Sequence, residues 1–168
     1  MALASITAMT PLKAMAQLPA QDVMNAMQPM DSPTAFVAVA LAAVSWDGVL
    51  TKAGSRALRH ALDYREPFRH MSDAEMIQLF DRLLAQLRLE GCRQLMEHAS
   101  AVLDPRQRLT AFTVAAEIMR SDGELVAEEQ RILEDLASHL TIPAAQHDQI
   151  LQVMDLLHAS LVGNPVLA

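Results

Sequence analysis

The sequence contains one cysteine, Cys92, and no apolar stretch long enough to cross a membrane. A single cysteine excludes an internal disulfide bond, which is typical of proteins from reducing compartments, so we expect a cytoplasmic location. The longest apolar stretch runs from Ala35 to Val44, well short of the ~20 residues of a membrane-spanning helix. The first residues also lack a basic cluster before an uninterrupted apolar stretch, and Pro11 follows closely. The sequence therefore predicts no membrane insertion and no export.

Positive charge is scarce as well. The 13 Lys and Arg residues stand against 20 Asp and Glu residues, which gives a net charge of −7. A chain of this charge is repelled by phosphate backbones, and no run of basic residues with interleaved aromatics offsets the repulsion locally, so we expect no nucleic-acid partner. The charge is also uneven, because residues 117–135 hold seven acids and two arginines, whereas residues 52–69 hold five Lys or Arg and two acids. This distribution predicts two surfaces of opposite charge.

Sequence motifs of the common enzyme classes are missing. There is no G-x-S-x-G, no Walker loop, no dinucleotide-binding fingerprint and no HExxH. Cys92 has no local signature of a nucleophile, so we expect an inert or buried thiol. No histidine shows metal-ligand spacing, although the last two should share a helical face, and we expect surface or half-buried roles for all six: His60, His70, His98, His139, His147 and His158. The sequence thus predicts a protein that is not an enzyme.

What the sequence does have is a series of helix-start signals. Ser32-Pro33 combines a capping side chain with a proline that the first helical turn tolerates. Residues 72–75 read as a capping box, with Met71 and Met76 spaced as a hydrophobic staple across it, and residues 104–107 repeat the cap pattern. No segment alternates polar and apolar residues over a useful length, so we expect no sheet. The predicted fold is all-α, a compact bundle of about seven helices.

Apolar residues recur at helical spacing after these starts. Gly91 is expected to interrupt one helix, and Gly163 to end the last one. The residues expected to face the core are Met76, Phe80, Leu83 and Leu87, then Leu109, Phe112, Ala116 and Met119, then Leu133, Leu136 and Leu140, and finally Ile150, Met154, Leu157 and Leu161.

Three regions are predicted along the chain. Residues 1–30 hold six of the eleven methionines and three prolines, so we expect a Met-rich arm rather than a long helix. Because methionine packs adaptably, the arm would either cover its own domain, which we favour, or grip a partner. Residues 31–163 would form the helical domain, and residues 164–168 a C-terminal tail.

A duplication is suggested when the chain is aligned with itself at an offset of 75 residues. Residues 39–58 then match residues 114–133, and each segment has a helix, an Asp-Gly turn and a second helix. Glycine supplies a positive φ where a helix ends, and aspartate can bond nearby backbone N–H groups. The identical pairs are Val39 and Val114, Ala40 and Ala115, Asp47 and Asp122, Gly48 and Gly123, Leu50 and Leu125, Arg56 and Arg131, and Leu58 and Leu133.

The second of these segments is rich in acids, namely Glu117, Asp122, Glu124, Glu128 and Glu129. Hard cations such as Ca²⁺ or Mg²⁺ need several convergent oxygen ligands, which helix-borne carboxylates beside a turn would supply. The spacing is not that of an EF-hand, since Gly123 directly follows Asp122. The alternative is structural: acids in the first turn of a helix are favoured by its dipole, and Asp-Gly is a turn signal by itself.

The aligned segments AAVSWDGVLTKAG and AEIMRSDGELVAEEQRILEDLASHL resemble the tellurite-resistance TerB-like family, over about residues 34 to 160. The resemblance implies a helical domain with an acidic surface that binds divalent metal, and a role in a stress response. Within the DG-x5-E pattern of the family we carry this over only to Asp47, Asp122 and Glu129. The first segment departs from the pattern, because Gly54 stands where Glu129 does and Ala42 where Glu117 does.

Two functional hypotheses follow. The first is a non-enzymatic module that binds Ca²⁺ or Mg²⁺ through the second, acidic segment and acts through protein partners in a stress response, with a homodimer among the options. The second is a metal-free interaction scaffold that uses the two charged surfaces; a hydrolase that uses the carboxylates is a third, weaker option. Trp46, the only tryptophan, would either mark a contact surface or pack over the first turn. The metal ligands of the first hypothesis are Asp122, Glu129, Glu117, Glu128 and Asp47.

Overall fold

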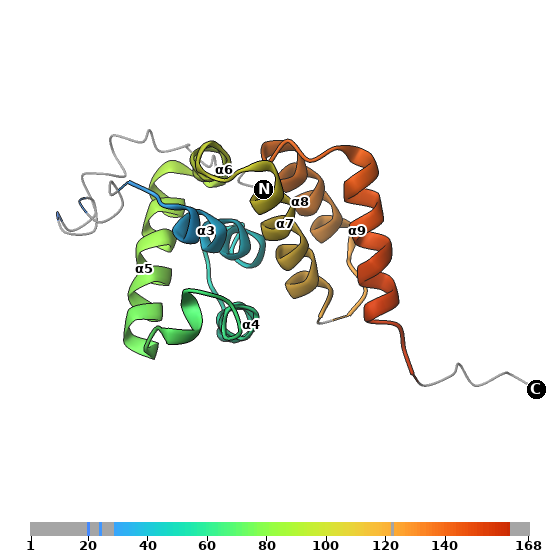
Figure 1. Ribbon diagram of the computed structural model, residues 1–168, viewed down its shortest axis with the longest axis horizontal. Helices are drawn as coiled ribbons and strands as arrows, with labels where there is room; N and C mark the ends of the chain where they lie inside the picture. The colour runs from blue at the N-terminus through green and yellow to red at the C-terminus, as the bar shows by residue number, and fades with distance from the viewer. Residues whose placement is uncertain (1–19, 21–23, 25–28, 122, 162–168) are drawn as a thin grey trace, which may run out of the picture.

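The computed structural model describes residues 20, 24, 29–121 and 123–161 of the chain. These residues form helices and no strand, which confirms the all-α prediction (Figure 1). The labelled elements are α3 (Ser32–Val44), α4 (Lys52–Leu62), the 3-10 helix η1 (Phe68–His70), α5 (Asp73–Glu90), α6 (Cys92–Val102), α7 (Pro105–Arg120), α8 (Ala127–His139) and α9 (Ala144–Leu157). Seven α-helices between residues 29 and 161 match the expected number.

Helix α3 is the centre of the bundle. It packs against α4, α5, α6, α7 and α8, and Figure 1 shows it between α5 on one side and α7 on the other. Its small side chains, from Ala35 to Ala43, are buried almost without exception, which allows the neighbouring helices to approach closely. Larger core residues such as Phe112, Leu83 and Leu133 fill the space around it.

The helix starts follow the predicted caps with one correction. Asp31, not Ser32, caps α3, because its Oδ1 accepts a bond from Thr34 N at 2.9 Å. Hydrogen bonding by Thr34, mainly through its side chain and to a smaller extent through this backbone N–H, holds the pKa of Asp31 below its usual value. Ser32 is instead the first residue of the helix. The capping boxes at residues 72–75 and 104–107 are present as predicted.

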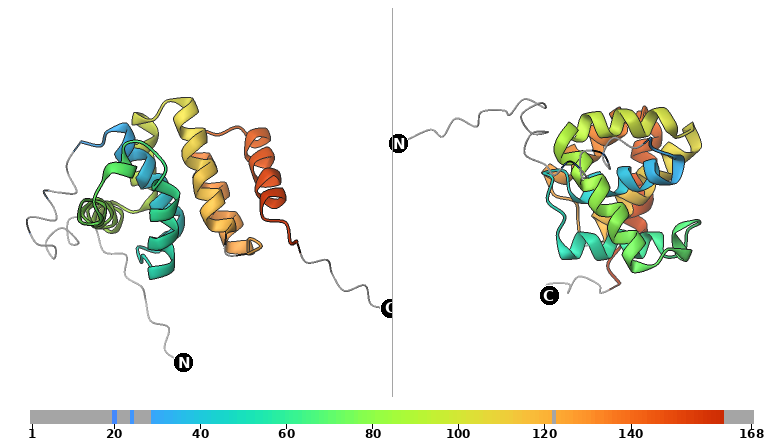
Figure 2. Two further views of the ribbon diagram at one scale, coloured as in Figure 1. Left: turned by 60° about the horizontal axis from the view of Figure 1, so that its bottom comes forward. Right: turned by 90° about the vertical axis from the view of Figure 1, so that its left-hand side faces the viewer.

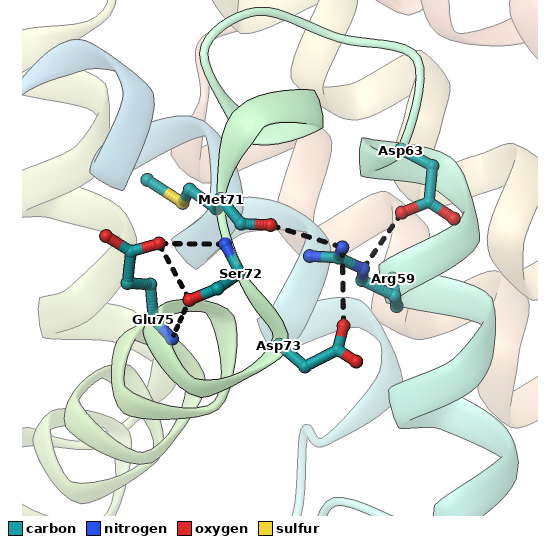
Figure 3. Close-up of polar contacts among 6 residues, drawn as sticks. All are labelled: Arg59, Asp63, Met71, Ser72, Asp73 and Glu75. Carbon is teal, nitrogen blue, oxygen red and sulfur yellow. Dashed lines mark hydrogen bonds and ion pairs between the residues drawn. The ribbon is translucent and has the colours of Figure 1, made fainter.

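Arg59 connects α4 with the start of α5 (Figure 3). Its Nε lies 2.8 Å from Oδ1 of Asp63, the residue that caps the C-terminus of α4, and its Nη2 lies 3.5 Å from Asp73 Oδ1. The same Nη2 donates to Met71 O at 3.4 Å, directly before the capping box of Ser72 and Glu75. One cation of the predicted basic surface is therefore engaged within the domain.

The last helix, α9, lies at the outer edge of the molecule, on the far side from α5 (Figure 2). It packs on α7 and α8 through a narrow strip around Met154, and it ends at Leu157. The predicted end at Gly163 and the inward positions of Leu157 and Leu161 are therefore wrong: these leucines are 61% and 101% exposed. A peripheral helix buries only one narrow face, so the third position of the predicted stripe, Leu157, turns to solvent, and the fourth, Leu161, lies beyond the helix.

Two further predictions concern the chain ends and the membrane. Most of the Met-rich arm and the tail lie outside the described residues; of the arm, Met24 is exposed and Met30 packs against the core. None of the described helices is long and apolar enough to cross a membrane.

Candidate functional site between the two Asp-Gly segments

The first Asp-Gly segment joins α3 to α4. Gly48 has a φ of 82°, which glycine tolerates, and its N–H donates to Ser45 O at 2.8 Å. Asp47 Oδ1 accepts a bond from Val49 N at 2.9 Å, so this carboxylate helps to fold the turn. From α5, Arg88 Nε donates to Gly48 O at 2.8 Å. The turn is therefore held by its own aspartate and by an arginine that lies far away in the sequence.

The second Asp-Gly segment joins α7 to α8. Gly123 has a φ of 144° and its N–H donates to Arg120 O at 3.3 Å. The side chain of Arg120, only 7% exposed, donates through Nη1 to Gly123 O at 2.6 Å and pairs through Nε with Asp155 Oδ1 of α9 at 3.0 Å. Asp122, the first of the predicted metal ligands, lies outside the described residues.

Glu128 and Glu129 stand in the first turn of α8, where the helix dipole favours acids. Glu128 is exposed, and Glu129 is half-buried. Glu129 Oε2 accepts a bond from Val126 N at 2.9 Å, which satisfies one of the backbone N–H groups that a helix start leaves free. Glu129 therefore has a structural role at the start of α8. Its carboxylate retains further lone pairs that could bind another ligand.

A hollow of about 330 Å³ lies between the two segments. Asp47 borders it from the first segment, and Glu128 and Glu129 border it from the start of α8. Trp46 also lines it and packs against the core, as the packing interpretation expected. The remaining wall is mainly apolar and comes from α3, α4, α7 and α8: Ala43, Val44, Ala57, Ile118, Met119 and Ile132.

The hollow thus brings together three of the five predicted ligands. Glu117, half-buried on α7, is not among its lining residues, and neither is the exposed Glu124. Among the residues that the structure describes, no group of three or more His, Cys, Asp or Glu side chains is placed to hold a metal ion. What the described part offers chemically is a negatively charged rim above an apolar floor.

Two features of this site were not predicted from the sequence. The first is the pair of arginines, Arg88 and Arg120, that bind the two glycine carbonyls. Arg88 is forty residues from its partner, and no local pattern indicates such a contact. Arg120 directly follows the apolar stripe of α7. A basic residue at the end of a helix can bond free carbonyl groups there, so its position in the sequence could have indicated this contact. The second is the hollow itself, which arises from the approach of the two helix pairs.

The remaining sequence candidates have structural roles. Burial raises the pKa of the Cys92 thiol to about 12, with Asp135 adding to the effect, so the thiol stays protonated and inert as predicted. The histidines are exposed or half-buried, also as predicted. His147 on α9 contacts the Phe112 ring, with centroids 5.5 Å apart, and its Nδ1 lies 2.9 Å from Asp148 Oδ1.

Comparison with known proteins identifies the family. The model of the family described as tellurite resistance protein TerB matches residues 33–152, which include every described helix apart from the ends of α3 and α9. No curated protein and no solved structure gives a significant match. Because the matched segment spans most of the chain and contains both Asp-Gly segments, the chain belongs to the TerB family.

Proposed function

We propose that this TerB-family protein is a non-enzymatic module that binds a divalent cation, Ca²⁺ or Mg²⁺, at its second Asp-Gly segment. One observation carries the proposal: carboxylates from both segments, Asp47 from the first and Glu128 and Glu129 from the second, border one hollow. Carboxylate oxygens are the ligands that these cations prefer. In the proposal Asp122 completes the ligand set, with Glu117 as a further candidate on the incoming helix.

The affinity of this site is expected to be modest. Asp47 and Glu129 each already accept a backbone N–H, so a cation would share these oxygens with the turn or displace the bonds. The described carboxylates alone do not make a chelating group, so the proposal depends on Asp122 as a further ligand. A dissociation constant in the range of weak sensors and extracellular modules, about 10⁻⁵ to 10⁻³ M, follows from such a shared ligand set.

Calorimetry with Ca²⁺, Mg²⁺, Mn²⁺ and Zn²⁺ tests the proposal. Asp122→Asn should abolish the binding heat, and Glu128→Gln should weaken it, because each removes a charged ligand but keeps the shape of the side chain. Glu134→Gln, an exposed acid of α8 that does not line the hollow, is the matched control and should bind as the unmodified chain does. No binding heat from the unmodified chain at millimolar cation would refute the proposal.

The metal-free scaffold is the second candidate. Exposed acids line the outer surface of α8, including Glu128, Glu134 and Asp135, while Lys52 and Arg56 are exposed on α4. Such surfaces would attract a partner, or a second copy of the chain, through charge. Sedimentation over a salt series checks this, since charge-driven association weakens as salt is added, whereas association that ignores ionic strength would contradict it.

The cellular role forms the last part of the proposal. We propose that the module acts in the cytoplasm in a tellurite-type stress response, through protein partners that recognise the acidic site. Family membership supports this role. Pull-down from cells grown with and without tellurite, using the unmodified chain and Asp122→Asn, tests it: a partner set identical in all four samples would contradict the coupling.

A further inference from the structure

The hollow between the two Asp-Gly segments combines features that a small metal ion does not use. Its floor is apolar, with Ile118, Met119 and Ile132 from the second helix pair. Trp46, half-buried, forms part of its wall. A hydrated divalent cation gains nothing from an indole ring and aliphatic side chains, because it is bound through oxygen atoms alone.

The rim of the hollow is negative but spread out. Asp47 approaches from the α3–α4 segment, while Glu128 and Glu129 approach from the start of α8. Within the described residues these carboxylates do not form a group that fits a single metal ion. Nor does any lysine or arginine of the described chain line the hollow. The rim is thus suited to a cation that is larger than a metal ion and that carries several donors pointing in different directions.

We propose that this hollow seats an arginine side chain from a partner protein. A guanidinium group is planar, carries five N–H donors and is weakly hydrated, so it can bond separated carboxylates while its flat face lies on an indole ring. The three methylene groups of arginine would contact the apolar floor, as long cationic side chains commonly do on apolar surfaces. The acidic rim and the net charge of −7 attract a basic partner segment at long range.

Arginine fits better than lysine for a geometric reason. A lysine ammonium is a compact and strongly hydrated point charge, whereas the planar guanidinium fork is suited to bond carboxylates that come from two segments, here Asp47 and Glu128. The partner segment itself would remain on the surface and reach the hollow with one side chain. A volume of about 330 Å³ is at the lower end of small-ligand sites, which suits one side chain rather than a folded element.

This inference deepens the proposed function, since it rests on the same acidic site and names the chemistry of its protein partner. It also predicts competition, because Glu128 and Glu129 cannot give the same oxygens to a divalent cation and to a guanidinium group. Cation binding at the second segment would then release the partner's arginine. Titrations with and without divalent cation separate the two ideas, since arginine binding in chelator does not require that any metal binds.

The only tryptophan of the chain is a reporter for the test. The full-length protein, in buffer with chelator, is titrated with the peptide acetyl-Gly-Ser-Arg-Ser-Gly-amide while Trp46 fluorescence is recorded. Two matched peptides replace arginine by lysine or by citrulline, which has nearly the shape of arginine but no charge. We expect a saturable change with a millimolar dissociation constant for the arginine peptide, at least threefold weaker binding for lysine, and none for citrulline.

Variants locate the binding. Asp47→Asn combined with Glu128→Gln should weaken the arginine peptide at least fivefold, and the asparagine oxygen still accepts the turn bond from Val49 N. Glu124→Gln combined with Glu134→Gln removes two exposed charges that do not line the hollow, and should change binding less than twofold. Circular dichroism of each variant verifies that the helices are intact.

Three results would overturn the inference: no response to the arginine peptide, equal responses to arginine and citrulline, or equal loss in the two double variants. A response to lysine as strong as that to arginine would overturn the guanidinium assignment. Added Mg²⁺ or Ca²⁺ should weaken the arginine peptide in competition. If the calorimetric metal heat is absent but the arginine response persists, the metal proposal fails and the arginine site stands.

Discussion

In both Asp-Gly segments the glycine N–H donates to the carbonyl three residues earlier, but the side-chain contacts that support the two glycines differ. In the first, the carbonyl of Gly48 is bound by Arg88, an exposed residue of α5. In the second, the carbonyl of Gly123 is bound by Arg120, which is buried and also paired with Asp155 of α9. The first turn is thus tied to the α5 side of the bundle and the second to its last helix. The comparison teaches that matching sequence around two turns need not mean matching support.

The helices that follow the two segments, α4 and α8, also start with different side-chain hydrogen bonds. Thr51 Oγ1 accepts a bond from Gly54 N at the start of α4, whereas Glu129 Oε2 accepts a bond from Val126 N at the start of α8. Thr51 and Val126 are equivalent positions when the chain is aligned with itself at an offset of 75 residues, as are Gly54 and Glu129. Each segment therefore keeps one half of a capping box. Glu129, which has no acidic counterpart in the first segment, therefore stabilises the start of α8 whether or not it also binds a ligand.

The largest effect is expected from the arginines. Arg120→Ala removes a buried cation that bonds both Gly123 O and Asp155, and should lower the free energy of unfolding by about 2–3 kcal/mol. Arg88→Ala removes one exposed hydrogen bond and should cost about 0.5–1 kcal/mol. Urea denaturation of both variants measures the difference. Equal losses would show that the two turns depend on their arginines to the same extent.

A second, smaller difference is expected at the glycines. A Cβ at Gly48 would lie 3.3 Å from Arg88 Cγ, in a backbone conformation with φ of 82° that side chains rarely adopt. Gly48→Ala should therefore lower stability by about 1–2 kcal/mol. At Gly123 the φ of 144° is also unfavourable, but no atom lies within 4 Å of the added Cβ. Thermal unfolding should show the smaller loss for Gly123→Ala, and a larger loss there would contradict this comparison.

Much of this fold was predictable because helix signals are local. The capping boxes at Ser72 and Asp104 and the buried stripe of α5 follow from residues within a few turns of each other. The errors lie where tertiary contacts decide. Leu157 has the same spacing as its buried neighbours, but α9 is packed on one side only, and the sequence contains no sign of this.

The candidate site was predicted less completely. Local sequence indicated Asp47, Glu128 and Glu129, and the structure places all three at one hollow. The local sequence did not indicate that the hollow has an apolar floor, because Ile118 and Ile132 have no feature that distinguishes them from other apolar helix residues. The internal duplication remains a prediction from the alignment. Aligning the chain with itself identifies equivalent positions in the two segments. It does not predict how closely the two helix pairs approach each other, because this depends on the packing of the whole bundle.

The smallest effect is expected from a substitution that would complete the capping box at the start of α8. Val126 is the residue before α8, has extended backbone angles and is 59% exposed, so a threonine fits there without loss of packing. Val126→Thr should supply a hydroxyl acceptor for Glu129 N, as Thr51 does for Gly54 N, and raise stability by about 0.5–1 kcal/mol. Thr51→Ala, the reciprocal change, should lower it by about 1 kcal/mol. Urea denaturation of both variants measures these opposite signs. A loss of stability in Val126→Thr would mean that the start of α8 is held in place by contacts of the valine methyl groups, and that the two helix starts are not equivalent even in their backbone chemistry.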